Sequence, residues 1–228
     1  MTDGDQRRAM RAMEVIGPPG AGKSTLAAAL ADRTAEFRIV KHYRGTDRLP
    51  YVLRAGPAVA SVVLRDPIGH SLGRRQLAWI ARVESGLRML ERRRTTIVFD
   101  QGPLYTLARL SDLVRGRPAG GALDGWRHAK SQQLAGLLDL IVVVDAPDSI
   151  LVERIATRVK AHRLQHLPLG SAQAALARAR VGYDELISQV TSDNGPRVLR
   201  LDSSRDALPT MVDVVLGALR ADDPRQPS

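Results

Sequence analysis

A run of nine residues near the N-terminus combines the residue types that can hold a chain of phosphate groups. Residues 17–25 read Gly-Pro-Pro-Gly-Ala-Gly-Lys-Ser-Thr, which fits the spacing G-x-x-x-x-G-K-[ST]. Glycines let the backbone bend until successive amide N–H groups point at the same anion. The lysine adds a positive charge, and the hydroxyl group after it can ligate a divalent cation. The residues expected to bind the phosphates are Gly17, Pro18, Pro19, Gly20, Ala21, Gly22, Lys23, Ser24 and Thr25.

The segments on either side of this run are those that a phosphate-binding loop needs. Met13–Ile16 is a short apolar run that predicts a strand, and Ser24–Ala35 is rich in alanine and leucine, which favour a helix. The helix N-terminus adds the positive end of its dipole to the site. We therefore expect ATP and Mg²⁺ as cofactors, with Lys23 at the β- and γ-phosphates and Ser24 on the metal. The base-reading N-K-x-D element of GTPases is absent from the sequence.

An acidic residue stands where the clearest β-branched run of the chain ends. Thr95–Phe99 predicts a strand, and Asp100 follows it directly. One carboxylate at a strand end, facing the phosphate loop, can hold Mg²⁺ through water or accept the proton of a substrate hydroxyl. Asp100 is therefore predicted to be a catalytic and metal-binding residue, and the alternative is a plain strand-end cap. The acidic pair of large ATPases is not found, because Gln101 comes next.

Strands and helices alternate along the chain, which predicts an α/β fold with a parallel sheet of about five strands and helices on both faces. One domain over residues 12–220 is expected, between disordered tails at 1–11 and 221–228, because no repeat or low-complexity linker divides the chain. Residues 115–125 are rich in glycine and proline and predict a surface loop. Strands are expected at 13–16, 37–40, 95–99, 140–144 and 197–201. Helices are expected at 24–35, 76–94, 104–113, 126–138, from 148 through 158 toward 162, 171–190 and 208–219.

Composition and charge limit the classes of partner. The 228 residues include 34 Lys and Arg against 24 Asp and Glu, a net charge of +10 that favours anionic ligands. Only four of the basic residues are lysine, the arginines are scattered, and aromatic residues make up 4%, so a small phosphorylated molecule is favoured over nucleic acid. No apolar run approaches the roughly 20 residues that cross a bilayer, so no membrane partner is expected. Cysteine is absent, which excludes disulfides and thiolate metal sites and predicts a cytoplasmic location.

The order of elements resembles the thymidylate kinase and deoxynucleoside kinase group of P-loop kinases over about residues 13–220, with the phosphate loop as its specific motif. In that group the third strand ends in an acid followed by arginine, whereas Asp100-Gln101-Gly102 keeps the acid and lacks the arginine. Leu138–Asp145 is similar to the strand before the lid. Leu151–Arg158 resembles the L-x-x-R-I-x-x-R with which the lid helix begins. The resemblance implies a three-layer P-loop fold with a lid over about residues 154–170.

Two arginines of the lid are predicted to act in catalysis. Arg154 and Arg158 are four residues apart, which places them on one face of a helix. Planar guanidinium groups there could grip the transferred phosphoryl group as its charge spreads in the transition state. The alternative is an exposed arginine stripe that pairs with nearby glutamates such as Glu153. Together with Lys23 and Asp100, these arginines form the predicted catalytic set.

The residues predicted to bind the acceptor come from segments that the fold would place opposite the phosphate loop: Arg44, Arg82, Gln101 and Tyr105. The alternative for Arg82 and Tyr105 is a place on a helix surface. The sequence thus predicts an ATP- and Mg²⁺-dependent phosphotransferase with a small-molecule acceptor, a nucleoside or nucleotide by resemblance. Alternatives are a kinase for a sugar, antibiotic or vitamin precursor, a nucleotide-binding regulator with slow ATPase activity, and a nucleic-acid end kinase. A homodimer is compatible with the sequence.

Overall fold

The computed structural model describes residues 11–34, 36–41, 56–57, 60, 74–114, 122–159, 162–191 and 195–220. Within them, five parallel strands form one sheet in the order β2-β3-β1-β4-β5, which confirms the predicted α/β class. The strands are β1 (Ala12–Ile16), β2 (Phe37–Lys41), β3 (Thr96–Asp100), β4 (Leu140–Asp145) and β5 (Arg197–Asp202). The helices are α2 (Lys23–Arg33), α5 (Arg74–Glu91), α6 (Pro103–Val114), α7 (Ala122–Ala135), α8 (Asp148–Ala156), the 3₁₀ helix η3 (Arg163–His166), α9 (Leu169–Val190) and α10 (Leu208–Arg220).

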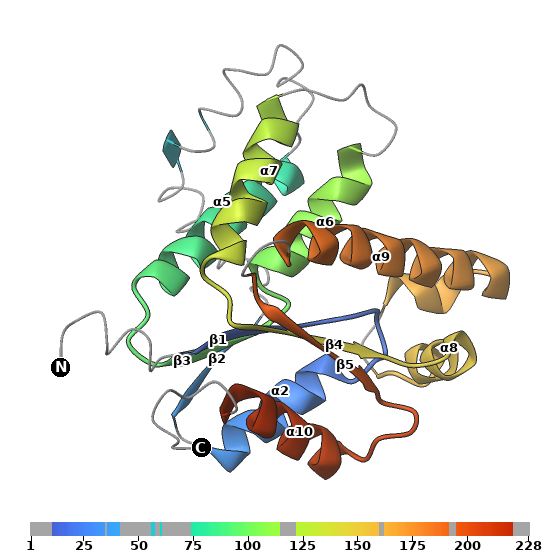
Figure 1. The fold of residues 1–228 in the computed structure, drawn as a ribbon. Helices are drawn as coiled ribbons and strands as arrows, with labels where there is room; N and C mark the ends of the chain where they lie inside the picture. The colour runs from blue at the N-terminus through green and yellow to red at the C-terminus, as the bar shows by residue number, and fades with distance from the viewer. Residues whose placement is uncertain are drawn as a thin grey trace.

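Helices cover both faces of the sheet, so the molecule has three layers (Figure 1). Helices α5, α6, α7 and α9 lie over one face, whereas α2 and α10 lie over the other. The strand side chains alternate between two hydrophobic cores. Along β1, Ala12 and Ile16 belong to the core under α5 and α6, and Met13 and Val15 belong to the core under α2 and α10. Strands buried on both faces appear in a sequence as continuous apolar runs, which is why they could be predicted.

The strand order of the sheet divides at the central strand, β1. Strand β3 pairs with β1 on one side and β4 pairs with it on the other. Their register places Val15 opposite Asp100 and Ile16 opposite Val143, so the carboxyl ends of the three strands meet at one edge. Open α/β sheets bind ligands at such an edge, where the strand order divides.

Helix α8 ends at Ala156, so it is shorter than the helix predicted to continue toward His162. The side-chain amide of Gln165, from η3, donates to the carbonyl oxygens of Ile155 and Arg158, at 2.9 Å in both cases. The carbonyl groups at the end of a helix need partners that the helix itself does not supply. Gln165 supplies them here, and the chain leaves the helical path.

The segment predicted as a surface loop at 115–125 is helical in its last residues, because α7 begins at Ala122. Leu123 is buried in the core, and Asp124 lies in the first turn, where its negative charge favours the helix. These two features offset the low helix propensity of Gly125. The remaining residues of the segment, 115–121, lie outside the described residues.

Of the two predicted tails, at residues 1–11 and 221–228, only Arg11 lies within the described residues. Its guanidinium group lies 3.5 Å from the carboxylate of Asp139. None of the helices among the described residues has both the length and the apolar character needed to cross a bilayer.

Candidate active site

The loop between β1 and α2 curls because its glycines adopt backbone angles that other residues avoid. Gly17, Gly20 and Gly22 have φ values of 140°, 86° and 89°. At Gly17 the packing also excludes a side chain, since a Cβ atom would lie 1.9 Å from the carbonyl oxygen of Val144 on β4. Gly22 is the N-cap residue of α2, so the curl ends at a helix N-terminus. A curled loop that leads into a helix N-terminus is an arrangement that binds phosphate groups.

Lys23, the first residue of α2, is buried within this loop. Its Nζ atom donates a hydrogen bond to the carbonyl oxygen of Pro18 at 2.7 Å. Burial lowers the pKa of Lys23 to about 8, while the carboxylates of Asp100 and Asp145 raise it and the charge of Arg158 lowers it. Most Lys23 side chains therefore carry a positive charge at neutral pH, and two carboxylates lie close enough to act on that charge.

Asp100 ends β3 close to this lysine, where the sequence predicts it. It is 6% exposed, and its Oδ1 atom is buried without a hydrogen-bond partner in the described part of the chain. A buried oxygen left without a partner costs roughly 1–3 kcal/mol, so it marks a position where a ligand is expected. Mg²⁺ is commonly held by one or two carboxylates together with substrate phosphates and water. Asp100, with the exposed residue Ser24 at the start of α2, fits such an ion.

The turn after Asp100 is strained and closely packed. Gln101 has a φ of 64°, in the left-handed region that residues with side chains rarely adopt. A Cβ atom on Gly102 would lie 2.6 Å from the side chain of Phe99, so this position accepts only glycine. The Nη2 atom of Arg82, from α5, donates to the carbonyl oxygen of Gln101 at 2.8 Å. Strained residues of this kind cluster at active sites, where the surrounding structure holds them in place.

A pocket lies between this turn, α5 and the ends of β2 and β3. It is lined by Val40, Lys41, Arg82, Ser85, Gly86, Met89, Phe99, Gln101, Gly102 and Pro103. Two of the residues predicted to bind the acceptor, Arg82 and Gln101, therefore belong to it. Tyr105 does not line the pocket, and its ring centroid lies 6.1 Å from that of Tyr183 on α9. Arg44 lies outside the described residues.

The two lid arginines have different surroundings. Arg154 on α8 donates to Ser203, with Nη1 to Oγ and Nη2 to the carbonyl oxygen both at 2.9 Å, and Nη1 lies 3.4 Å from the carbonyl oxygen of Gly20. It thus connects α8 to the turn after β5 and to the phosphate loop. Arg158 is exposed, and its charge acts on Lys23. The prediction that both arginines share one helix face is wrong, because α8 ends between them.

Positive charges converge near residues 158–163, at the start of the predicted lid. The pKa of His162 is lowered by burial and then by the charges of Arg158, Arg163, Lys23 and Arg109. These cations come from α2, α6 and the lid itself, far apart in the sequence. A site that gathers positive charge from several elements attracts a polyanion.

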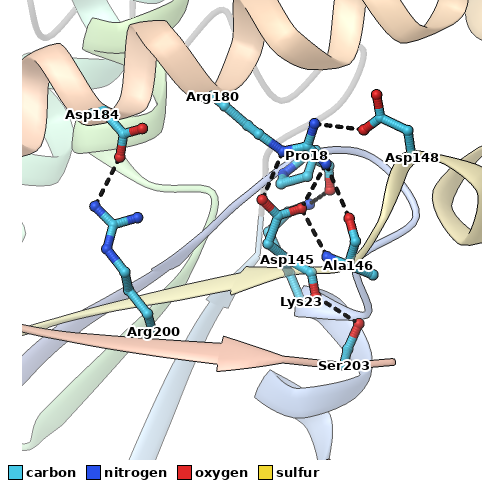
Figure 2. Close-up of polar contacts among 9 residues, drawn as sticks. All are labelled: Pro18, Lys23, Asp145, Ala146, Asp148, Arg180, Asp184, Arg200 and Ser203. Carbon is cyan, nitrogen blue, oxygen red and sulfur yellow. Dashed lines mark hydrogen bonds and ion pairs between the residues drawn. The ribbon is translucent and has the colours of Figure 1, made fainter. Parts of the chain in front are cut away.

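Arg180 is a site residue that could not be predicted from the sequence. It connects α9 to the end of β4 and to the start of α8 (Figure 2). Its Nε and Nη2 atoms donate to the two carboxylate oxygens of Asp145 at 2.7 and 3.1 Å, and Nη1 donates to Asp148 at 2.5 Å. Nη2 also donates to the carbonyl oxygen of Ala146 at 3.0 Å. The hydrogen bonds from Asp145 in particular raise the pKa of Arg180. No local pattern marks this arginine, because 35 residues separate it from Asp145.

Comparison with known proteins identifies the family and the fold. The model of a family described as an AAA domain matches residues 13–182, and the chain belongs to this family. The structure is similar to deoxyadenosine kinase from M. mycoides with bound dCTP, over 92% of this chain and 99% of that one, with 15% sequence identity and a TM-score of 0.56. It is also similar to the YorR protein from Bacillus subtilis in complex with phosphorylated GDP, over 92% and 96% of the two chains, with 12% identity and a TM-score of 0.56.

These similarities confirm the predicted fold. The three-layer architecture is that of P-loop NTPases, and the predicted resemblance to the deoxynucleoside kinase-like group of P-loop kinases holds at the level of the fold. No curated protein matches the sequence of this chain.

Proposed function

We propose that this protein is a phosphotransferase that uses ATP and Mg²⁺ to phosphorylate a small hydroxyl- or phosphate-bearing acceptor, a nucleoside or a nucleotide. The observation that carries the proposal is the position of Asp100. This buried carboxylate has one oxygen without a partner in the described residues, acts on the charge of Lys23 in the phosphate loop, and precedes a residue that lines the pocket. A cation for the donor and an open carboxylate for the acceptor are the groups that phosphoryl transfer needs.

The phosphate loop binds the donor in this proposal. Lys23 exchanges its hydrogen bond to Pro18 for oxygens of the β- and γ-phosphates, and the curled backbone from Gly17 to Gly22 supplies N–H groups. Arg158 adds positive charge near the γ-phosphate from the lid side. Asp100 and Ser24 are the residues that would hold Mg²⁺, which when bound neutralises phosphate charge and helps the leaving group depart.

The acceptor binds on the side of Asp100 and the pocket. Its hydroxyl or phosphate oxygen attacks the γ-phosphorus, the bond between this phosphorus and the bridging oxygen breaks, and ADP leaves with the electron pair of that bond. When the acceptor is a hydroxyl group and Mg²⁺ is held through water, the carboxylate of Asp100 is free to accept the proton of that group. Arg158 stabilises the charge that spreads over the transferred group in the transition state.

The nucleoside or nucleotide class rests on the two similar structures, one a deoxyadenosine kinase with bound dCTP and the other a complex with phosphorylated GDP. One observation favours a second candidate, a kinase for another small hydroxyl compound: Gln101 stands where the resembling group has arginine. In both cases we propose a small acceptor rather than nucleic acid, since the arginines are scattered along the chain and aromatic residues make up only 4% of it. The homodimer and the cytoplasmic location stay predictions from the sequence.

A panel of nucleosides, nucleotides and sugars tests the proposal through acceptor-stimulated release of ADP. We expect one acceptor class to raise the rate of ADP release well above the rate with ATP and Mg²⁺ alone, and a phosphorylated product to appear in equal amount. Lys23→Ala is the control and should remove the stimulated rate. Slow ATP turnover that no compound of the panel stimulates would contradict the phosphotransferase and support a nucleotide-binding regulator.

A further inference from the structure

Glu14 is a glutamate in the middle of the central strand β1, and it is completely buried. It lies on the same face of β1 as Ala12 and Ile16, whose side chains belong to the core under α5 and α6. The residues paired with it on the neighbouring strands are Phe99 and Ile141, both apolar. A buried carboxylate is costly unless hydrogen bonds compensate for the loss of water, so its partners indicate why it is there.

The partners of Glu14 are backbone N–H groups at the start of α6. The N–H of Leu104 donates to Oε2 at 2.9 Å, and the N–H of Tyr105 donates to Oε1 at 2.8 Å. The backbone of Gly102 also hydrogen-bonds to the carboxylate. The first N–H groups of a helix have no partner within the helix, and a negative charge placed there is favoured by the helix dipole. Glu14 therefore acts as a cap for α6 that comes from another element, 90 residues away in the chain.

The capped residues form one turn with the candidate catalytic acid. Asp100 ends β3, the strained Gln101 follows, and α6 begins at Pro103. Glu14 accepts hydrogen bonds from N–H groups at the end of this turn, while Arg82 donates to the carbonyl oxygen of Gln101 within it. A residue in the left-handed region keeps that conformation only when neighbouring contacts enforce it. The carboxylate of Glu14 and the guanidinium group of Arg82 are two such contacts, and the N–H of Gln101 also donates to the carbonyl oxygen of Val15 at 3.4 Å.

We propose that Glu14 is a positioning residue for phosphoryl transfer: its carboxylate fixes the start of α6, and through it the turn that carries Asp100, without touching the substrate. This inference rests on the proposed function. Because Asp100 has a carboxylate oxygen without a protein partner in the described residues, its own hydrogen bonds fix its direction poorly. The backbone of the turn must do so instead. The residues of the turn also line the pocket, so Glu14 shapes the acceptor side and has no contact with the phosphate loop in the described structure.

The charge of Glu14 matters for this role, because a protonated carboxyl group has one oxygen that donates instead of accepting. Burial raises the pKa of Glu14 to about 7, against the effects of the N–H groups of α6 and of the guanidinium group of Arg82 on α5. The residues opposite it on the neighbouring strands, Phe99 and Ile141, carry no charge, and Tyr105 contributes its backbone N–H. We therefore expect the turn to be held most firmly above about pH 7, and kcat to fall as the pH drops below that value.

The test compares Glu14→Gln with a matched variant, Glu84→Gln. Glu84 is also a buried glutamate, 6% exposed, and its Oε1 accepts from Trp126 at 3.0 Å and from Lys130 at 2.9 Å, on the face of α5 that meets α7. For the wild-type protein and both variants, the measurements are the melting temperature, the dissociation constant of ATP, and kcat and KM for the acceptor found in the panel. Each is followed across neutral pH.

We expect Glu14→Gln to lower kcat by roughly 10–100-fold, because small displacements of a catalytic group have effects of this size. Its ATP affinity should stay within about twofold of the wild type, since the phosphate loop is untouched. The loss of kcat below about pH 7 should also disappear in this variant and persist in Glu84→Gln. A folded Glu14→Gln protein with the kcat and the pH profile of the wild type would overturn the proposal, as would equal losses of kcat in the two variants.

Should Glu14→Gln fail to fold, Glu14→Asp takes its place, because it keeps the charge but shortens the side chain that reaches the N–H groups of Leu104 and Tyr105. A lower kcat with the ATP affinity of the wild type supports the proposal, and the kcat of the wild type overturns it. The failure of the proposed function has a different signature, because wild-type protein without acceptor-stimulated ADP release would reject the function before any variant is compared.

Discussion

On the donor side of the sheet edge, which comprises residues 17–24, 145–158 and 203, arginines bind fixed partners within the protein. Arg180 binds Asp145 and Asp148, and Arg154 binds Ser203. On the proposed acceptor side, which comprises residues 100–103 and the pocket that residues 101–103 line, a buried polar group is held without a hydrogen-bond partner in the part of the chain that the structure describes. There Asp100 keeps a buried oxygen without a partner in the described residues, and the residue after it is strained.

The contrast separates groups that build the site from groups that await a ligand. Fixed hydrogen bonds on the donor side keep the phosphate loop and the base of the lid in one arrangement before nucleotide arrives, so little reorganisation is needed on binding. The open oxygen of Asp100 is costly in the free protein and is satisfied when a ligand arrives. Substitutions on the donor side should therefore affect nucleotide binding or stability, with Lys23 and Arg158 as exceptions because the proposed function places them at the transferred group.

The largest effect is expected for Lys23→Ala. Removing the cation that neutralises the β- and γ-phosphates should lower turnover by roughly 10³-fold or more. The melting temperature should not fall, because the variant also removes a charge whose burial lowers its pKa to about 8. Steady-state kinetics and a thermal melt measure the two quantities. Turnover within tenfold of the wild type would remove Lys23 from the donor site.

Asp100→Asn separates binding from transfer on the acceptor side. The amide has the same shape but lacks the charge, so ATP without Mg²⁺ should bind within about twofold of the wild-type affinity while transfer falls by roughly 10²–10⁴-fold. Calorimetric titration with ATP and an ADP-release assay measure the two effects. Asp184→Asn, at an exposed position on α9, is the control and should leave both unchanged. Persistent transfer in Asp100→Asn would make Asp100 a structural residue.

The two lid arginines should have different kinetic effects if the comparison holds. Arg158→Ala should lower kcat by roughly 10²-fold, since its charge reaches the phosphate site. Arg154→Ala should instead raise KM for ATP by roughly tenfold, because it releases the contacts to Ser203 and Gly20 that order the donor side. Initial rates at varied ATP separate kcat from KM. Identical changes in both variants would contradict separate roles.

The affinity for ATP without metal should depend on pH through Lys23. Its pKa of about 8 means that the charged form is lost as the pH rises through that value. Between about pH 7.5 and 9 we expect the dissociation constant to rise by roughly five- to tenfold. Lys23→Arg, whose side chain stays charged, should bind with an affinity that is nearly independent of pH over this range. A flat profile in the wild type would contradict the role of this charge in binding.

The smallest effects are expected for two arginines that form ion pairs, Arg180 and Arg200 (Figure 2). Arg180→Gln should lower the free energy of unfolding by about 1–3 kcal/mol, since it removes a fork that binds two carboxylates. Arg200→Gln removes an ion pair with Asp184 whose side chains are both more than half exposed, and the change should stay below about 1 kcal/mol. Urea unfolding of the two variants measures both changes in the free energy of unfolding. Equal changes would contradict a larger stabilising role for Arg180.

Features of this fold that depend on neighbouring residues in the sequence could be predicted. The phosphate loop was found because its glycines and lysine lie within nine residues, and Asp100 because it directly follows a β-branched run. The five strands were found because each is a short apolar or β-branched segment between helical ones. In each case the physical cause acts over a few residues.

Features that depend on contacts between distant segments could not be predicted. Arg180 meets Asp145 across 35 residues, and Glu14 meets Leu104 across 90. The position of Arg158 beyond the end of α8 could not be predicted either. The end of this helix depends on the side-chain amide of Gln165, which binds the carbonyl oxygens of Ile155 and Arg158 from further along the chain. Tertiary contacts overrode the helical spacing there.

The first glycine of the phosphate loop illustrates how structural and catalytic requirements differ. A side chain at Gly17 would collide with the carbonyl oxygen of Val144, an atom of the sheet itself. A related chain that bound no nucleotide would thus still need glycine at position 17 to pack against its sheet. Lys23 and Asp100 carry no such steric requirement, so their joint retention is the better guide to whether a related chain could carry out the proposed transfer.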